Sequence, residues 1–134
     1  MSAQVMAIVQ KAIYELLTGD TALMTMISGV YSNVPQNTST PYVVFSQIQT
    51  RNLGASGNLR VEVNIDLNVY SQQKGNKELS DIMERQAILL DDATISLVGY
   101  SVVTIHEISS VITGLRDGLT RQGRHQFRLI IQEN

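Results

Sequence analysis

The chain contains two histidines, His106 and His125, and both lie in segments whose pattern predicts β-strands. An imidazole can act as a general base or bind a metal ion when a carboxylate or a second ligand is close by. Glu107 or Glu62 could supply such a carboxylate across a sheet. Neither histidine has another histidine or a cysteine at ligand spacing, so we favour a structural or solvent-facing role and predict no metal site and no cofactor.

Paired carboxylates are the other candidates for acid–base chemistry. Asp91 and Asp92 are neighbours whose side chains point apart, and Glu62 and Asp66 lie two same-face steps apart on a polar strand face, where we expect them to be solvated. The sequence contains neither the phosphate-binding GxxxxGK[ST] motif nor the dinucleotide GxGxxG motif. No serine follows a sharp strand-to-helix turn of the kind that exposes a nucleophile. We therefore predict no catalytic residue and no enzyme activity.

One charge feature stands out, and it is a basic segment near the C-terminus. Thirteen residues that include one acid, Asp117, contain four arginines: Arg116, Arg121, Arg124 and Arg128. Acids gather elsewhere, on and just after a predicted helix: Glu78, Asp81, Glu84, Asp91 and Asp92. Opposite charges of this kind could join copies of the chain head to tail. Contact with a nucleic-acid backbone and a plainly solvated loop are alternative interpretations of the arginines.

These side chains need elements to hold them, and the clearest element is the stretch from Arg60 to Tyr70. Apolar side chains occupy the odd positions from 61 to 69, and polar side chains occupy the even positions from 60 to 68. Successive side chains of a strand point to opposite faces, so this period predicts a strand with one apolar and one polar face. Such a strand is typical of an antiparallel sheet that is covered on one face only.

Two amphipathic helices are predicted to cover the apolar face. Residues 3–18 and 76–90 each repeat apolar side chains at helical spacing, with Asn76 as a cap of the second helix. Asp20 is expected to cap a short helix between the first helix and the sheet. Further strands are predicted at 30–31, 41–48, 101–108 and 124–132. The order α-α-β-β-β-α-β-β predicts an α+β domain, in which an antiparallel β-sheet has two long helices packed on one face.

Two long loops are expected to project from this core. Residues 50–58 are rich in Gly, Asn and Ser, and residues 109–123 contain three glycines. Loops of this length without secondary structure are uncommon in compact domains and are usually functional or disordered. Leu53 on the first loop has little local core to enter, and Leu115 lies on the second. A flexible connection and an arm that docks on a neighbouring copy are both consistent with the first loop.

Length and composition restrict the remaining possibilities. A chain of 134 residues with 43% hydrophobic residues is expected to form a single domain, residues 1–134. The net charge of −2 gives no general attraction to nucleic acid or to an anionic membrane. Cysteine is absent, which excludes disulfides and thiolate metal sites. No apolar run approaches the roughly 20 residues that a membrane span needs, so we expect no membrane partner and synthesis as a cytoplasmic protein.

Several segments, taken in order, resemble a known family. They are Asp20 to Leu23, Gly29 to Gln36, Pro41 to Phe45, Leu67 to Ser71 and Arg124 to Arg128. Together they are similar to the tail completion proteins (tail terminator or tail-to-head joining proteins) of long-tailed phages, prophages and phage-like particles. The resemblance covers nearly the whole chain. Its most specific part runs from Val30-Tyr31 to Pro35-Gln36 and on to Pro41-Tyr42-Val43-Val44.

The resemblance implies a structural virion protein of the tail or neck, assembled in the bacterial host cytoplasm. Such proteins form a ring, expected to be a hexamer, that caps the major tail tube protein and presents a surface to the head connector or stopper. DNA would pass through the ring lumen without sequence-specific binding. A head-side adaptor or stopper, a small nucleic-acid-binding domain and a small enzyme are the alternatives. We expect the subunit or partner interface to include Leu53, Leu115, Arg116, Arg121, Arg124, Asp91 and Asp92.

Overall fold

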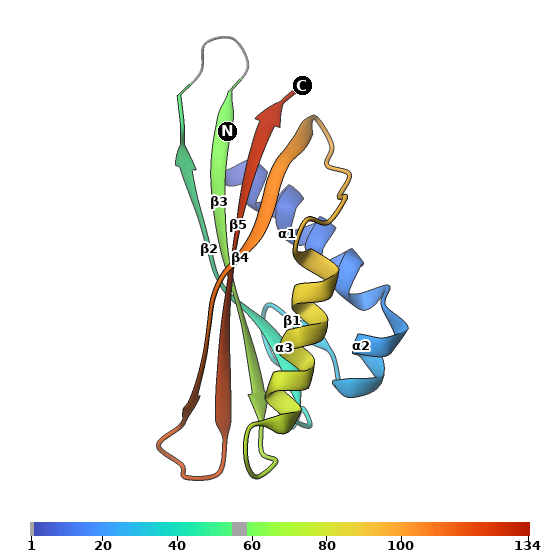
Figure 1. Cartoon of the computed structure of the whole chain (residues 1–134), viewed down its shortest axis with the longest axis vertical. Helices are drawn as coiled ribbons and strands as arrows, with labels where there is room; N and C mark the ends of the chain where they lie inside the picture. The colour runs from blue at the N-terminus through green and yellow to red at the C-terminus, as the bar shows by residue number, and fades with distance from the viewer. Residues whose placement is uncertain (1, 55–58) are drawn as a thin grey trace.

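The computed structural model describes residues 2–54 and 59–134, and Figure 1 shows its arrangement. Its elements are α1 (Ser2–Thr18), α2 (Thr21–Met26), β1 (Val30–Tyr31), β2 (Tyr42–Asn52), β3 (Arg60–Ser71), α3 (Lys77–Leu90), β4 (Tyr100–Gly114) and β5 (Arg121–Glu133). One sheet has the strand order β1-β2-β3-β5-β4. Every neighbouring pair is antiparallel except β1 and β2, which are parallel. The predicted α+β class and the predicted order of elements are confirmed.

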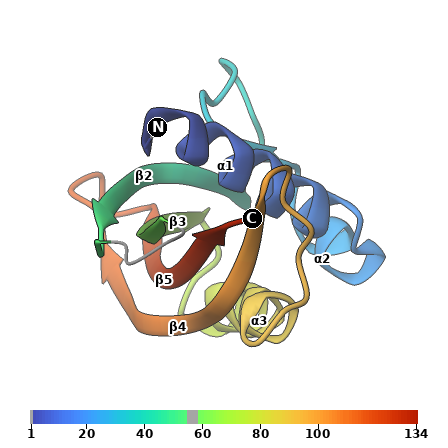
Figure 2. The ribbon, with the colours of Figure 1, turned by 90° about the horizontal axis from the view of Figure 1, so that it is seen from above.

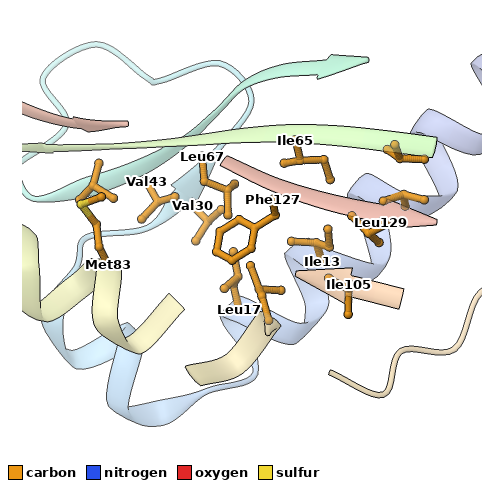
Figure 3. Packing of buried hydrophobic residues seen from close by; sticks show 14 of the residues in the cluster. Ile13, Leu17, Val30, Val43, Ile65, Leu67, Met83, Ile105, Phe127 and Leu129 are labelled. Carbon is orange, nitrogen blue, oxygen red and sulfur yellow. The ribbon is translucent and has the colours of Figure 1, made fainter. Parts of the chain in front are cut away.

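The helices lie on one side of the sheet, and the sheet curls so that its outer strands bend around its central pair (Figures 1 and 2). The predicted alternation on β3 explains which face they cover. Val63 pairs with Leu129 and Ile65 pairs with Phe127 across β3 and β5, so apolar side chains from both strands point to the helices. Figure 3 shows Phe127 beside Ile13 of α1, within a cluster of fully buried side chains.

Asp20 connects two of the helices, as a cap and as an ion pair. Its carboxylate accepts a hydrogen bond from the Leu23 backbone N–H at 2.8 Å, which confirms it as the cap of α2. The same carboxylate accepts two hydrogen bonds of 2.8 Å from the Arg85 guanidinium on α3. The hydrogen bonds from Arg85, followed by that from Leu23, lower the pKa of Asp20 to about 2. This bidentate contact fixes α2 against α3.

The prediction of a fifteen-residue loop after β4 is wrong over most of its length. β4 continues to Gly114 and β5 begins at Arg121, so the turn between them spans only 115–120. Two register shifts in β4, between Val102 and Thr104 and between Glu107 and Ser109, break the alternation by which a strand is recognised in a sequence. The projecting segment is therefore a β-hairpin.

The first predicted loop is also shorter than expected. β2 continues to Asn52, and the Leu53 backbone N–H donates to the Arg60 carbonyl oxygen at 3.0 Å, which extends the contact between β2 and β3. Residues 55–58 of that predicted loop lie outside the described residues. The β2–β3 end and the β4–β5 turn lie at opposite ends of the long axis of the molecule (Figure 1).

Truncation of Phe127 tests whether this apolar layer stabilises the fold. Phe127→Ala removes a fully buried ring and should lower the free energy of unfolding by about 3–5 kcal/mol. The matched control is Val111→Ala on the neighbouring strand β4, because Val111 is exposed and its loss should change stability by less than about 0.5 kcal/mol. Urea denaturation followed by circular dichroism measures both values. Equal losses for the two variants would contradict this account of the core.

Candidate functional site

His125 is buried within the helix-covered layer and joins three elements. Its ring has no exposed surface, its Nδ1 lies 2.8 Å from Gln86 Nε2 on α3, and its Nε2 contacts the Glu107 carboxylate on β4. A neutral imidazole with its proton on Nε2 fits both partners, because Nδ1 then accepts from the Gln86 amide and Nε2–H donates to Glu107. The sequence predicted a structural or solvent-facing histidine that could pair with Glu107, and His125 takes the structural role.

Burial lowers the pKa of His125, and the hydrogen bond and charge of Glu107 oppose that shift. The nearest hollow is open, has a volume of about 440 Å³, and is lined by Ser80, Met83, Glu84, Glu107, Ser110 and Ile112. Glu107 therefore lies between the imidazole and the hollow. Because His125 exposes no atom to this space, its geometry supports positioning of α3 against β4 and β5 rather than contact with a substrate.

Asp91, Asp92 and His106 form a second titratable group at the outer side of β4. His106 Nδ1 lies 3.4 Å from Asp91 Oδ1 and 3.6 Å from Asp92 Oδ1. Among the residues that the structure describes, these three side chains are the group whose donor atoms are close enough to hold a metal ion, and all three are exposed. The expectation that the Asp91 and Asp92 side chains point apart is wrong, because both carboxylates approach one imidazole. They lie at the end of α3, where the helix dipole adds further negative potential.

The predicted solvation of Glu62 and Asp66 is wrong. Each residue is only 6% exposed, because arginine side chains cover the polar face of the sheet. Arg51 of β2 lies 2.8 Å from Glu62, and Arg128 of β5 lies 3.5 Å from the same carboxylate. Arg124 of β5 lies 3.3 Å from Asp66. Three arginines therefore share two carboxylates, so this face keeps a surplus of positive charge.

The four arginines of the basic segment do not form one patch. Arg124 and Arg128 belong to the polar face just described, whereas Arg121 Nε donates to the Asn76 side chain at the start of α3, at 2.7 Å. Asn76 occupies the N-cap position of α3, as predicted, but its side chain makes no cap hydrogen bond to the helix. Arg116 lies exposed in the β4–β5 turn. The interpretation of the arginines as one basic loop fails because β5 begins at Arg121 and its residues alternate between faces.

The two ends of the molecule expose leucines. Leu53 at the β2–β3 end is 41% exposed, and Leu119 in the β4–β5 turn is 60% exposed. Leu115 is half-buried, and its backbone N–H donates to the Thr120 carbonyl oxygen at 2.9 Å. Asp117 shapes this turn by accepting from Thr120 and Leu119, and these hydrogen bonds lower its pKa.

Two features of these surfaces were missed in the sequence. Arg51 was assigned to a loop, although Gln47, Gln49 and Arg51 continue the alternation of β2 and this period could have placed it on the polar face. Leu119 lies within the predicted loop of residues 109–123. Its position between Gly118 and Thr120 is typical of a short turn, and that signal could have placed it at a hairpin end.

This arrangement defines a class of protein. The domain is a helix-backed sheet with exposed hairpin ends and charged outer strands, and its buried histidine serves packing. Within residues 2–54 and 59–134, no helix has the length and apolar character to cross a membrane. Such a surface is suited to contacts between protein subunits.

Comparison with known proteins identifies the family. Residues 11–132 match the family model described as "Tail completion protein gp17", and the chain belongs to this family. It is therefore a structural protein of a tail. No curated protein matches the chain.

A solved structure has the same fold. One chain of a structure titled "Virion of native gene transfer agent (GTA) particle" superposes with a TM-score of 0.86 at 17% sequence identity. The match covers 94% of this chain and 96% of that chain. At this identity the likeness shows a shared fold.

His125 should make stability depend on pH. Its pKa is lowered in the folded state, so below the unfolded value of about 6.5 the unfolded chain binds more protons than the folded chain. The stability contributed by neutral His125 is therefore complete above about pH 6.5 and is lost as the pH falls through the lower folded pKa.

Urea denaturation between pH 7 and pH 5 measures this loss. His125→Gln should flatten the dependence in this range, whereas His106→Gln, which changes the exposed histidine, should leave it in place. The chain has no third histidine to confuse the comparison. A profile that His106→Gln flattens and His125→Gln does not would contradict the assignment.

Proposed function

We propose that the chain is a tail terminator, which forms a ring that caps the tail tube and joins the tail to the head connector. The observation that carries the proposal is the family match over residues 11–132, since a protein that completes a tail acts where the tube ends. The ring is expected to be a hexamer, with DNA passing through its lumen without sequence-specific contacts. Assembly would take place in the host cytoplasm.

The shape of the subunit supports this proposal. A terminator must contact the tube on one side, the connector on the other, and its own copies laterally. The β2–β3 end and the β4–β5 turn point in opposite directions along the long axis, and each exposes a leucine, Leu53 or Leu119 (Figure 1). The outer strands β2 and β4 remain for lateral contacts. The net charge of −2 would cause little self-repulsion within a ring.

A head-side adaptor or stopper of the same particle is the second candidate, because it would share the ring geometry. A nucleic-acid-binding role has weaker support, since Arg124 and Arg128 already contact the carboxylates of Asp66 and Glu62. Nucleic-acid binding would show a steep dependence on salt concentration that Arg124→Gln reduces.

Ring formation and tube capping test the proposed function directly. Light scattering and negative-stain imaging of the purified protein should show closed rings, alone or on the ends of added tail tubes. Co-sedimentation should recover the protein with tail tubes rather than with tailless heads. Binding to heads alone would favour the adaptor or stopper. Binding to neither particle, without rings, would contradict both.

The exposed leucines should separate the two axial contacts. Leu53→Asp and Leu119→Asp each place a charge on one end of the molecule, so one variant should lose tube capping and the other should lose connector binding, while both still form rings. Val34→Asp is the matched control, because Val34 is also exposed but lies in the loop before β2. Co-sedimentation with tubes and with connector protein measures the outcome. Unchanged binding by both leucine variants would show that the hairpin ends do not make the axial contacts.

A further inference from the structure

The β2 side and the β4 side of the sheet present different charges. On the β2 side, β1 pairs only with Val43 and Val44, so the outer side of β2 from residue 45 to 52 has no strand beside it among the described residues. On the β4 side, the chain that follows α3 runs along the strand: the Asp92 backbone N–H donates to the Ile105 carbonyl oxygen at 2.9 Å. The two sides differ in the side chains that they present.

Negative charge is concentrated beside β4. Asp91 is held in place because its Oδ1 accepts a hydrogen bond from the Glu107 backbone N–H at 3.2 Å, and Asp92 is held by its own backbone contact with β4. His106 is the cationic partner within reach of both carboxylates, at 3.4 and 3.6 Å, and it carries charge only when protonated. The C-terminal end of α3 adds negative potential at the same point. The two carboxylates of this cluster can therefore accept hydrogen bonds from a further cation.

Arg51 is the charged residue of β2. Arg51 contacts Glu62, but its side chain is 70% exposed, and Arg128 shares the same carboxylate. A guanidinium has five N–H donors, so Arg51 can bind a second carboxylate without leaving Glu62.

We propose that Arg51 of one copy pairs with Asp91 and Asp92 of the next copy, so that the β2 side of each subunit docks against the β4 side of its neighbour. This inference rests on the proposed ring and names the lateral contact that closes it. Each side therefore binds a second copy of this chain. Charge complementarity selects the pairing, because two β2 sides or two β4 sides would bring like charges together.

Strand direction and register agree with this contact. Each step from β2 through β3 and β5 to β4 is antiparallel, so β2 and β4 run in opposite directions. A rotation about an axis along the strands places β2 of one copy antiparallel to β4 of the next. The register connects Arg51 through Glu62 and Ile130 to Thr104, two residues from His106. Arg51 and the acidic cluster therefore lie at nearly the same height.

The part of β4 that follows His106 can add apolar contacts with the neighbouring copy. Ile108 and Val111 are 46% and 51% exposed, and both lie on this outer strand beyond the acidic cluster. Contacts between different patches related by rotation close into a ring when the angle permits. The charge pair sets the register of the contact, and the apolar side chains contribute burial.

Cross-linking tests the contact in the whole protein. The chain has no cysteine, so Arg51→Cys combined with Asp91→Cys introduces the sole thiols. With a bifunctional thiol-reactive cross-linker long enough to replace the two side chains of the ion pair, the double variant should give a covalent ladder that ends at the ring size. Each single variant should stay monomeric on a denaturing gel. Dimers from a single variant would show that like sides meet and would overturn the proposal. Rings without a ladder would place the contact elsewhere and leave the ring itself standing.

Charge reversal provides the second readout. Arg51→Glu and Asp91→Arg should each weaken ring formation about tenfold or more, and the combined variant should recover most of it, because opposite charges again face each other. Lys11→Glu on the exposed side of α1 is the control with the same charge change and should have no effect. Thermal melting checks that each variant folds. Wild-type rings that are insensitive to both reversals would overturn this contact, whereas wild-type protein that never forms rings or caps tubes would overturn the proposed function itself.

Discussion

The pairing of β3 between β2 and β5 is the constraint on which the rest of the structure depends. Side chains of a strand alternate between faces, so a slip of one residue would send the apolar side chains of β3 to the arginine face and its acids to the helices. The register instead places Ile65 beside Phe127 and Glu62 opposite Arg51. It also brings Arg124, which pairs with Asn68, within reach of Asp66 on the same face. One alternation therefore builds both the core and the charge network. Among the described residues it leaves β4, and β2 beyond Val44, without a strand on the outer side.

His125 is the exception in the apolar row, and its partners explain why it is tolerated. It lies opposite Leu67 in the register, where an apolar residue would be expected. Burying a polar group costs folding free energy unless the group is hydrogen-bonded. Gln86 and Glu107 each contact one of the two ring nitrogens. These partners come from α3 and β4, so the network joins the helix layer to an outer strand. The position of β4, and with it the acidic cluster beside it, depends in part on this contact.

The sequence predicts the central strand and the helices well, because their periods are long and regular. It fails on β4, where the register shifts after Val102 and after Glu107 interrupt the alternation and make a strand resemble a loop. It also fails to pair charges: Arg124 and Asp66 are 58 residues apart, and local spacing carries no information about such contacts. His125 is a further example of a contact that local spacing does not reveal. The strand pattern places it on the apolar face but does not identify Gln86 as its partner.

The small net charge conceals how the charges are distributed, and the distribution matters for assembly. On the polar face three arginines share Glu62 and Asp66, and Arg51 on β2 is the most exposed of the three. At the two lateral sides pairing is incomplete, with an exposed arginine beside β2 and two carboxylates that share one imidazole beside β4.

Exposed ion pairs give specificity and register more than affinity. Lateral contacts of this kind would be weak between free subunits and would strengthen when several subunits are held together on a tube end, because binding there raises their effective concentration. A subunit with such sides would close a ring where a tube is present to template it, which is the behaviour that completion of a tail requires.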